Sequence, residues 1–388
     1  MTTSGLLLHL GYTKPYLMSK ATWFGSLYSI LLFAYPFTYL LGAVYSVGYV
    51  FGGAYFAVLT ILLGLMLVGL KSLDIYGVRR SAVVLLLGFM ILAVTIVPRY
   101  RLNYWSFFAW MVITVTTAHK STVNRQTVIR IATVFFYGYL LISALLLVHP
   151  ARYSAVGRFS GLVPSASVHS VYLLLSFGFF LSQGSRKGSI FSLLQVLYTQ
   201  SRTAVVGAAI MLVVRWAGFC RFDRFSKIVS VATFSLFLVG YPAFRVLQDQ
   251  GVGLTTLGRY EESAEDSSSR LRFGLVANLI SELERSNTLE LLIGHGGGQA
   301  RLQTLEAFAR DIQVHNDYLV VLYDFGLLIA LILFGVMLKA MNDNYLSFCL
   351  TVAYLVGFYH NMLLDRFLFG AVILIGSTST PSQRRCLR

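Results

Sequence analysis

Long apolar stretches recur along the whole chain, and they limit its possible folds more than any other feature of the sequence. Examples lie at 27–41, 54–70, 82–97 and 330–338. With its flanking residues, each approaches the roughly 20 residues that an α-helix needs to cross the hydrocarbon core of a bilayer. Of the 388 residues, 56% are hydrophobic and only 12% are charged, whereas about a quarter are charged in a typical soluble protein. The sequence therefore predicts an all-α integral membrane protein.

Clusters of lysine and arginine separate the apolar stretches and indicate their orientation. Positively charged residues gather in the cytoplasmic loops of membrane proteins, so we place the clusters on that side. They lie at 14–20, 71–80, 120–130, 186–187, 215–227, 339 and 384–388. The result is about twelve spans with both termini in the cytoplasm. The expected spans are 21–45, 49–70, 81–97, 102–118, 128–148, 166–183, two short helices within 188–214, 228–243, 318–338, 345–361 and 363–378.

This topology divides the chain into four parts. Residues 1–243 contain about nine spans, including the short pair, which a polar break at 199–203 separates. Residues 244–317 form one long outer loop. Residues 318–378 form the last three spans, and residues 379–388 form a cytoplasmic tail.

The net charge of +15 has two possible explanations, nucleic-acid binding and membrane orientation. Because the apolar stretches already predict a membrane protein, we attribute the charge to the cytoplasmic loops and expect no nucleic-acid partner. All seven lysines fall on the cytoplasmic side of this topology, and every outer basic residue is an arginine. A guanidinium group can bind phosphate through two parallel hydrogen bonds. Arginine outnumbers lysine 24 to 7, so composition alone is the alternative explanation.

The outer loop at 244–317 is large enough for a small lid or platform. It holds 11 of the 16 acidic residues, and its centre is expected to be helix, turn, helix. The serines at 267–269 could cap a helix that begins at Arg270, and apolar residues from Phe273 to Leu291 have helical spacing. The run "GHGGG" at 294–298 breaks that pattern. A tight turn with positive φ explains these glycines better than a phosphate-binding loop, because no lysine follows them.

Four arginines at the predicted outer boundary are candidates for an anion site. Arg270 and Arg272 are either solvated charges or a clamp at a helix start, where free N–H groups also favour an anion. Arg202 lies in the break between the short helices, and Arg158 lies just before the span at 166–183. Arg202 and Arg158 are each either exposed to water on the outer side or functional. A charge buried within an apolar segment is costly and is functional by default.

His315 and Asn316 stand where the outer loop meets an apolar helix. An imidazole suits proton transfer near neutral pH, and this position would hold it at the depth of a lipid headgroup. An amphipathic residue at the water boundary is the alternative explanation. His295, within the glycine run, is a weaker candidate.

Four motifs occur in an order that resembles one known superfamily. They are "GRFSGLVPSA" at 157–166, "SRTAVVG" at 201–207, "SSSRLRFGLVANLI" with "LLIGHGGG" in the outer loop, and "VHNDYLVVLYDFG" at 314–326. Together they resemble the O-antigen ligase and O-antigen polymerase superfamily, over about residues 150–340. The chain departs from that pattern at Phe273, where tryptophan is common, and at Asp324, where glutamate is common.

The resemblance implies a GT-C-like membrane glycosyltransferase of the bacterial inner membrane, with its outer loop and active site on the periplasmic side. Such an enzyme transfers a glycan from undecaprenyl diphosphate to a sugar hydroxyl. The acceptor is a lipid-linked repeat unit in an O-antigen, capsular or exopolysaccharide polymerase, which is the function that we favour. It is lipid A-core in an O-antigen ligase. Membrane lipids are expected partners, and a chain-length regulator is a further candidate.

The resemblance also implies roles for the candidate residues, and it implies neither metal nor cofactor. The three cysteines are scattered and have no metal-ligand spacing. Arg270 is expected to be the main contact of the diphosphate, where fixed cations would stabilise the leaving group. The arginines expected to assist it are Arg158, Arg202 and Arg272. His315 is expected to act as general base or to orient the acceptor, aligned by Asn316.

Two hypotheses from other functional classes stay open. A flippase or transporter for lipid-linked sugars would suit the number of spans, and arginines could guide the anionic lipid. The chain has no visible paired half-repeats, and Asp74, Asp223 and Asp343 all fall in cytoplasmic loops. A scaffold protein is the third hypothesis, and the arginines, histidine and asparagine at one depth argue against it.

Overall fold

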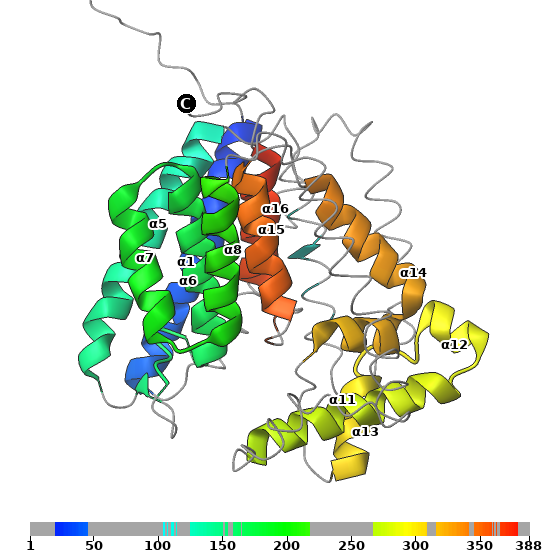
Figure 1. Ribbon diagram of the computed structural model, residues 1–388. Helices are drawn as coiled ribbons and strands as arrows, with labels where there is room; N and C mark the ends of the chain where they lie inside the picture. Colours follow the sequence, from blue (N-terminus) through cyan, green and yellow to red (C-terminus); the bar gives the residue numbers. More distant parts are fainter. Residues whose placement is uncertain are drawn as a thin grey trace, which may run out of the picture.

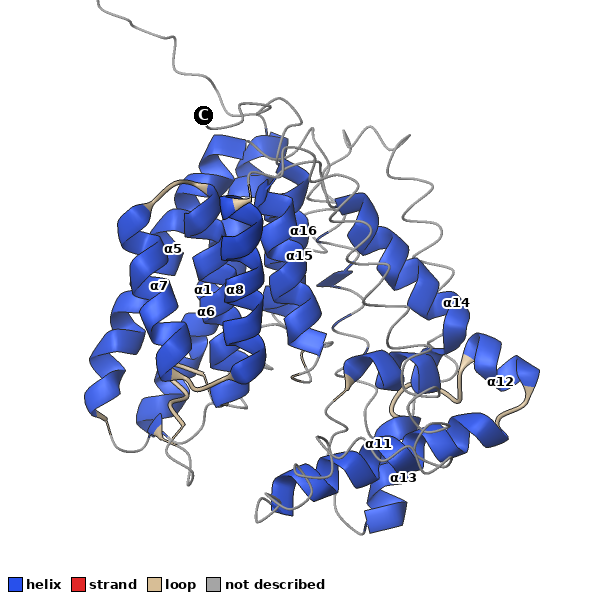
Figure 2. Cartoon of the chain, viewed as in Figure 1, coloured by secondary structure: helices blue, strands red, loops and turns tan. Residues whose placement is uncertain are grey.

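A computed structural model gives the fold of most of the regions that carry the motifs. It describes residues 20–45, 104, 107, 110–111, 114, 125–149, 152–153, 158–163, 165–217, 267–308, 316–340, 345–358, 360, 362 and 365–378. Within these residues the regular structure is helical, and no strand occurs among them; Tyr153 and Phe159 form an isolated antiparallel bridge (Figure 2). The all-α prediction is therefore confirmed for this part of the chain.

Among the described residues, seven α-helices lie side by side as a bundle, which we call the bundle throughout (Figure 1). Its central helix is α6, in which every residue from His169 to Leu181 is buried. The bundle consists of α1 (Lys20–Tyr45), α5 (Arg125–Leu145) with the short 3₁₀ helix η2 (Leu146–Val148), α6 (Ala166–Ser182), α7 (Arg186–Tyr198), α8 (Arg202–Trp216), α15 (Tyr345–Phe358) and α16 (Arg366–Thr378).

Small residues let the bundle helices approach closely. A Cβ atom on Gly178 of α6 would lie 2.8 Å from Cβ of Cys349 on α15, and one on Gly207 of α8 would lie 2.8 Å from a methyl group of Leu174. Such contacts between small residues are typical of helices that pack in a membrane, where van der Waals contact drives association. The expected short pair is present, since α7 ends at Tyr198 and α8 begins at Arg202.

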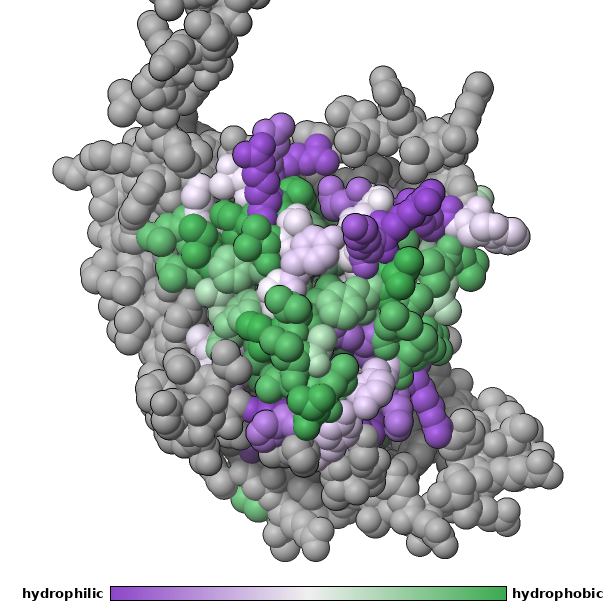
Figure 3. All heavy atoms as spheres, turned by 90° about the vertical axis from the view of Figure 1, so that its left-hand side faces the viewer, coloured by the Kyte–Doolittle hydropathy of each residue, from purple (hydrophilic) through white to green (hydrophobic). Residues whose placement is uncertain are grey.

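One face of the bundle is apolar on its outside as well as its inside. Exposed aliphatic residues on α5, α7 and α8 form a band, and Figure 3 shows it in green with hydrophilic residues along its upper and lower borders. Trp216 is 90% exposed at the end of α8. The most exposed aliphatic residues of these helices are Val134, Leu141, Leu145, Ile190, Leu194, Val206 and Val213.

A second, smaller unit lies beside the lower end of the bundle in Figure 1, and we call it the loop cluster. It consists of α11 (Ser267–Arg285), α12 (Thr288–Ile293), α13 (Gln299–Phe308) and residues 317–325 at the start of α14 (Asp317–Ala340). It has its own apolar core, made by Leu275, Leu279, Ile280, Ala300, Leu319, Val320 and Tyr323.

Two expectations about these helices were wrong in detail. The expected span 318–338 is not one straight helix, because Gly326 has a non-helical backbone (φ 70°, ψ 177°) that divides α14. The part before Gly326 lies between the two units: Leu319, Val320 and Tyr323 belong to the core of the loop cluster, while Val321 and Phe325 pack in the core of the bundle. The part after Gly326 continues beyond the loop cluster (Figure 1). The serines at 267–269 are already helical in α11, so they do not precede a helix that begins at Arg270.

The number of membrane spans stays a prediction. Among the residues that the structure describes, one helix, Arg125–Val148, is long and apolar enough to cross a bilayer by length and composition. Three shorter apolar helices lie at Ala166–Ser182, Tyr345–Gly357 and Arg366–Gly376. The spans expected at 49–70, 81–97 and 228–243 lie outside the described residues, as does most of the one at 102–118.

Candidate active site at one end of the bundle

The structure places some of the predicted site residues and leaves others undescribed. Arg202 is the first residue of α8 and is exposed, and Arg158 is half-buried in the segment before α6. Asn316 directly precedes α14, and its side-chain oxygen accepts a hydrogen bond from the backbone N–H of Leu319 (3.3 Å), as a helix N-cap does. His315 and the side chains of Arg270 and Arg272 lie outside the described residues.

The motif "GRFSGLVPSA" brings the segment before α6 against the end of α7. The ring of Phe159 lies 5.8 Å from that of Tyr198, the last residue of α7, and 5.2 Å from that of His169 on α6. Gly161 has a positive φ of 55°, and a Cβ there would overlap the imidazole of His169 at 2.3 Å. The glycine is therefore required by close packing. Arg158 is thereby held near the turn that carries Arg202.

The motif "SRT" meets the turn between α15 and α16. The hydroxyl of Thr203 and Nε2 of His360 lie 2.6 Å apart, and the hydroxyls of Ser201 and Thr203 lie 3.3 Å apart. This hydrogen bond joins residues that are 157 positions apart in the sequence. It fixes the start of α8, and hence Arg202, against the end of α15.

Two further polar pairs lie inside the same end of the bundle. The hydroxyl of Tyr172 donates to the carboxyl group of Asp365 (2.5 Å), and the hydroxyl of Tyr139 lies 2.6 Å from Nδ1 of His169. Asp365 also accepts a hydrogen bond from the backbone N–H of Leu368 (2.7 Å) and so caps α16.

Sequence reasoning missed His169, His360 and Asp365. His169 and Asp365 lie within the predicted spans 166–183 and 363–378, and His360 lies at the end of the predicted span 345–361. The signal that could have found them is the rule that drew attention to Arg202: an ionisable residue in an apolar segment is functional by default.

The glycine run at 294–298 is the turn that the sequence predicts, and it encloses an aspartate. Gly294, Gly296 and Gly298 have φ values of 82°, 111° and 93°. The backbone N–H groups of Gly298 and Ala300 donate to the two carboxyl oxygens of Asp324 (2.8 and 2.7 Å), while that of Gly296 donates to its carbonyl oxygen (2.9 Å). The carboxyl group thus sits at the N-terminus of α13, where an anion is favoured.

Asp324 also connects the loop cluster to a distant segment of the chain. The hydroxyl of Tyr104 donates to the carboxyl group of Asp324 (3.0 Å), across 220 positions of sequence. Asp324 precedes the break at Gly326, so it lies in the first part of α14, next to the glycine run. Burial raises the pKa of this carboxyl group to about 7, while the three hydrogen bonds act in the opposite direction.

His295 packs against Tyr323, the residue directly before Asp324. Its imidazole stacks on the ring of Tyr323, with 4.1 Å between centroids and 8° between planes. Its backbone N–H donates to the carbonyl oxygen of Tyr323 (2.8 Å), and its Nε2 lies 3.0 Å from the hydroxyl of Ser286. These contacts give His295 a structural role within the loop cluster.

The loop cluster touches the bundle near the candidate site. The hydroxyl of Tyr318, in the first turn of α14, donates to the backbone carbonyl of Leu355 near the end of α15 (3.4 Å). Asn316 is two residues before Tyr318, and His360 is five residues after Leu355. The described residues of four segments, 158–163, 199–203, 316–318 and 355–360 without 359, therefore gather at one end of the molecule, the lower end in Figure 1.

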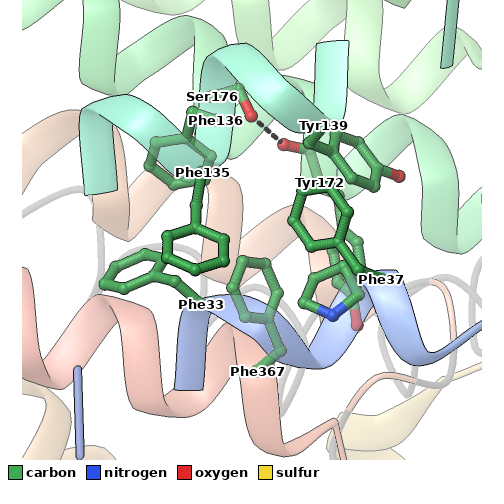
Figure 4. Close-up of a pocket in the computed structure, with 9 residues that line it drawn as sticks. Phe33, Phe37, Phe135, Phe136, Tyr139, Tyr172, Ser176 and Phe367 are labelled. Carbon is green, nitrogen blue, oxygen red and sulfur yellow. Dashed lines mark hydrogen bonds between the residues drawn. The ribbon is translucent and has the colours of Figure 1, made fainter. Parts of the chain in front are cut away.

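A small aromatic cavity lies within the bundle near this end (Figure 4). It measures about 10 Å³ and is lined by apolar groups, including Phe33, Phe135, Phe136 and Phe367. Such a volume holds one water molecule at most, and an apolar cavity of this kind stays dry. It is a packing gap and has no room for a sugar or a prenyl chain.

No protein-family model matches the chain, and no curated protein matches it at a significant level.

Proposed function

We propose that the protein is a GT-C-like bacterial inner-membrane glycosyltransferase with about twelve spans. It transfers a glycan from undecaprenyl diphosphate to an acceptor sugar at the periplasmic face. The exposed apolar band on α5, α7 and α8 supports the membrane location, because bilayer lipid would cover it. Arg186 and Lys187 at one end of α7 and Tyr198 at the other are residue types that mark membrane boundaries.

The observation that carries the proposal is the meeting of the motif segments at one end of the bundle. Arg158, Arg202 and Asn316 come from different parts of the chain and are drawn to that end by the contacts of Phe159, Thr203 and Tyr318. A reaction on a lipid-linked substrate requires such a meeting at one depth, because the prenyl tail stays in the bilayer and only its diphosphate and sugar reach the outer boundary.

In the proposed reaction the acceptor hydroxyl oxygen attacks the anomeric carbon of the donor glycan. The bond between that carbon and the phosphate oxygen breaks, and undecaprenyl diphosphate leaves with the electron pair. Arg270, assisted by the other arginines, stabilises the negative charge on the diphosphate, which is worth about 10²–10³-fold in rate for one such donor. His315 takes the hydroxyl proton, worth about 10²–10⁴-fold.

The proposed acceptor is another lipid-linked repeat unit, which makes the protein a polysaccharide polymerase. The test is the surface-glycan ladder of a deletion strain of the producing bacterium. A single repeat unit on the core is expected for a polymerase. Bare core with accumulated lipid-linked polymer on the periplasmic side would make it a ligase instead. Lipid-linked repeat units that accumulate on the cytoplasmic side would contradict both and favour a flippase.

The roles of individual residues are tested in the same strain. We expect Arg270→Ala and His315→Ala to abolish long glycan without lowering the amount of protein in the membrane. Arg285→Ala is the matched control, because Arg285 lies on the same helix, is 74% exposed and pairs only with neighbouring Glu282 among the ion pairs described. A ladder of normal length in Arg270→Ala or His315→Ala would remove that residue from the mechanism.

A further inference from the structure

The short helix α12 differs from the other helices of the loop cluster, because it buries none of its residues. Its sequence is "TLELLI", and all four of its apolar side chains are exposed: Leu289 at 63%, Leu291 at 38%, Leu292 at 39% and Ile293 at 40%. Helices α11 and α13 instead contribute apolar residues to the core of the loop cluster. Because α12 buries no apolar residue, its stability must come from other interactions. Its exposed apolar residues would also be covered by an apolar surface outside the loop cluster.

Local hydrogen bonds explain why α12 forms despite its length. The side chain of Asn287 accepts from the backbone N–H of Glu290 (2.9 Å), and the side chain of Glu290 accepts from the backbone N–H of Asn287 (2.9 Å). This reciprocal capping box satisfies two N–H groups at the helix start. The exposed leucines are therefore not needed to fold α12.

The end of α12 packs against the break in α14. The backbone of Leu292 lies against Gly326, where a Cβ would be 2.5 Å from the Leu292 carbonyl group. Gly326 is where α14 turns to run alongside the bundle, and Leu328 and Leu331 just beyond it are about half exposed. The exposed leucines of α12 thus lie beside the break in α14, which forms the first of the three proposed C-terminal spans (Figure 1).

We propose that α12 is an interfacial anchor whose leucines insert into the outer leaflet of the bilayer, at the boundary between headgroups and acyl chains. The inference rests on the membrane location given under the proposed function. The partner is lipid, because α12 packs against the break in α14, and the exposed Leu328 and Leu331 beyond that break would themselves be covered by lipid. Helices that lie at this boundary bury their apolar face about 5–10 Å deep.

The anchor would set the depth of the candidate site. The glycine run follows α12 directly and holds Asp324, and Asp324 lies on the same short helical segment that begins after Asn316. Fixing α12 at the level of the headgroups therefore fixes the height of Asn316 above the membrane. That height is the one at which a lipid-linked diphosphate would be presented.

Fluorescence quenching in lipid nanodiscs tests this placement. The full-length protein, with Cys220→Ser and Cys386→Ser and with the buried Cys349 retained, carries one added cysteine labelled with an environment-sensitive nitrobenzoxadiazole dye. We expect Leu289→Cys to lose emission to lipids spin-labelled near the headgroup more than to aqueous iodide. Glu284→Cys is the matched control, since it is exposed on neighbouring α11 and should respond mainly to iodide.

A third variant, Val213→Cys on the apolar band of α8, distinguishes failure of the proposed anchor from failure of the proposed membrane location. If Leu289→Cys responds to iodide as strongly as Glu284→Cys does while Val213→Cys responds to lipid, the anchor is wrong and the membrane location stands. If Val213→Cys also responds mainly to iodide, the membrane location is wrong and the anchor fails with it.

Discussion

The bundle and the loop cluster are both helical, but they are held together by different interactions. The bundle has one large core of packed aliphatic and aromatic side chains around α6. The loop cluster has a small core and relies on backbone contacts between Gly294 and Gly326 and on the hydrogen bonds to Asp324. We therefore expect the loop cluster to depend on a few specific atoms more than the bundle does.

The largest effect is expected at the two glycines. A Cβ on Gly294 would lie 2.4 Å from the carbonyl oxygen of Asp324, and one on Gly326 would lie 2.4 Å from the nitrogen of Gly294. Both residues also have φ and ψ values that almost only glycine adopts. We expect Gly294→Ala or Gly326→Ala to cost more than about 5 kcal/mol and to prevent the loop cluster from forming.

Limited proteolysis of the purified protein measures this effect, with cleavage expected in 267–325 while the bundle stays resistant. Gly184→Ala is the matched control. Gly184 also has a positive φ, of 73°, but a Cβ there would meet no atom within 4 Å. It should cost only about 1 kcal/mol. If Gly294→Ala and Gly326→Ala resist protease as well as Gly184→Ala does, the contact between Gly294 and Gly326 is unimportant.

Substitutions in the two apolar cores come next in size. We expect Phe179→Ala, in the bundle, to cost about 3–5 kcal/mol and Leu279→Ala, in the loop cluster, about 2–5 kcal/mol. Because Phe179 belongs to the large core around α6 and Leu279 to the small core of the loop cluster, the first should lower the thermal unfolding midpoint of the whole protein. The second should mainly make the loop cluster sensitive to protease. If Leu279→Ala lowers the midpoint as much as Phe179→Ala, the two units unfold together and the distinction fails.

The third effect is that the stability of the loop cluster depends on pH. Because burial raises the pKa of Asp324 to about 7, the folded protein binds this proton more tightly than the unfolded chain does. The contribution of Asp324 to stability is therefore greatest below the ordinary pKa of an aspartate and falls as pH rises to about 7, by at most about 4 kcal/mol. Asp324→Asn should lose this slope, measured as unfolding midpoint against pH. Parallel slopes in the two proteins would contradict the prediction.

The smallest effect is expected for the hydrogen bond between Thr203 and His360 in the bundle. Thr203→Val keeps the shape and removes the hydroxyl, which should cost about 1 kcal/mol. Thr203→Ser, which retains the hydroxyl, should keep most of that stability. If the valine and serine variants have the same unfolding midpoint, the hydrogen bond does not hold the start of α8.

The sequence predicts the helices of the bundle well, because long apolar runs and polar breaks are local signals. The pair α7 and α8 is an example in the bundle, and the turn at 294–298 is a similar example in the loop cluster. The break at Gly326 was missed because a single glycine in an apolar run is compatible with a helix. Its cause is the approach of Leu292 and Gly294, which are distant in sequence.

The candidate site could be predicted only in part for the same reason. The motifs predict Arg158, Arg202 and Asn316 as candidates, but the meeting of their segments depends on contacts with Tyr198, His360 and Leu355 that no local pattern reveals. His169 and Asp365 were missed because the rule on ionisable residues in apolar segments was applied to the arginines alone.

The central claim is that the end of the bundle with Arg158, Arg202 and Asn316 faces the periplasm. It is tested most directly by labelling single cysteines in intact cells, after removal of the outer membrane, with a maleimide that cannot cross the inner membrane. We predict that a cysteine replacing Glu284 is labelled in intact cells, while one replacing Lys187, at the opposite end of the bundle, is labelled only after lysis. The reverse pattern would contradict the account.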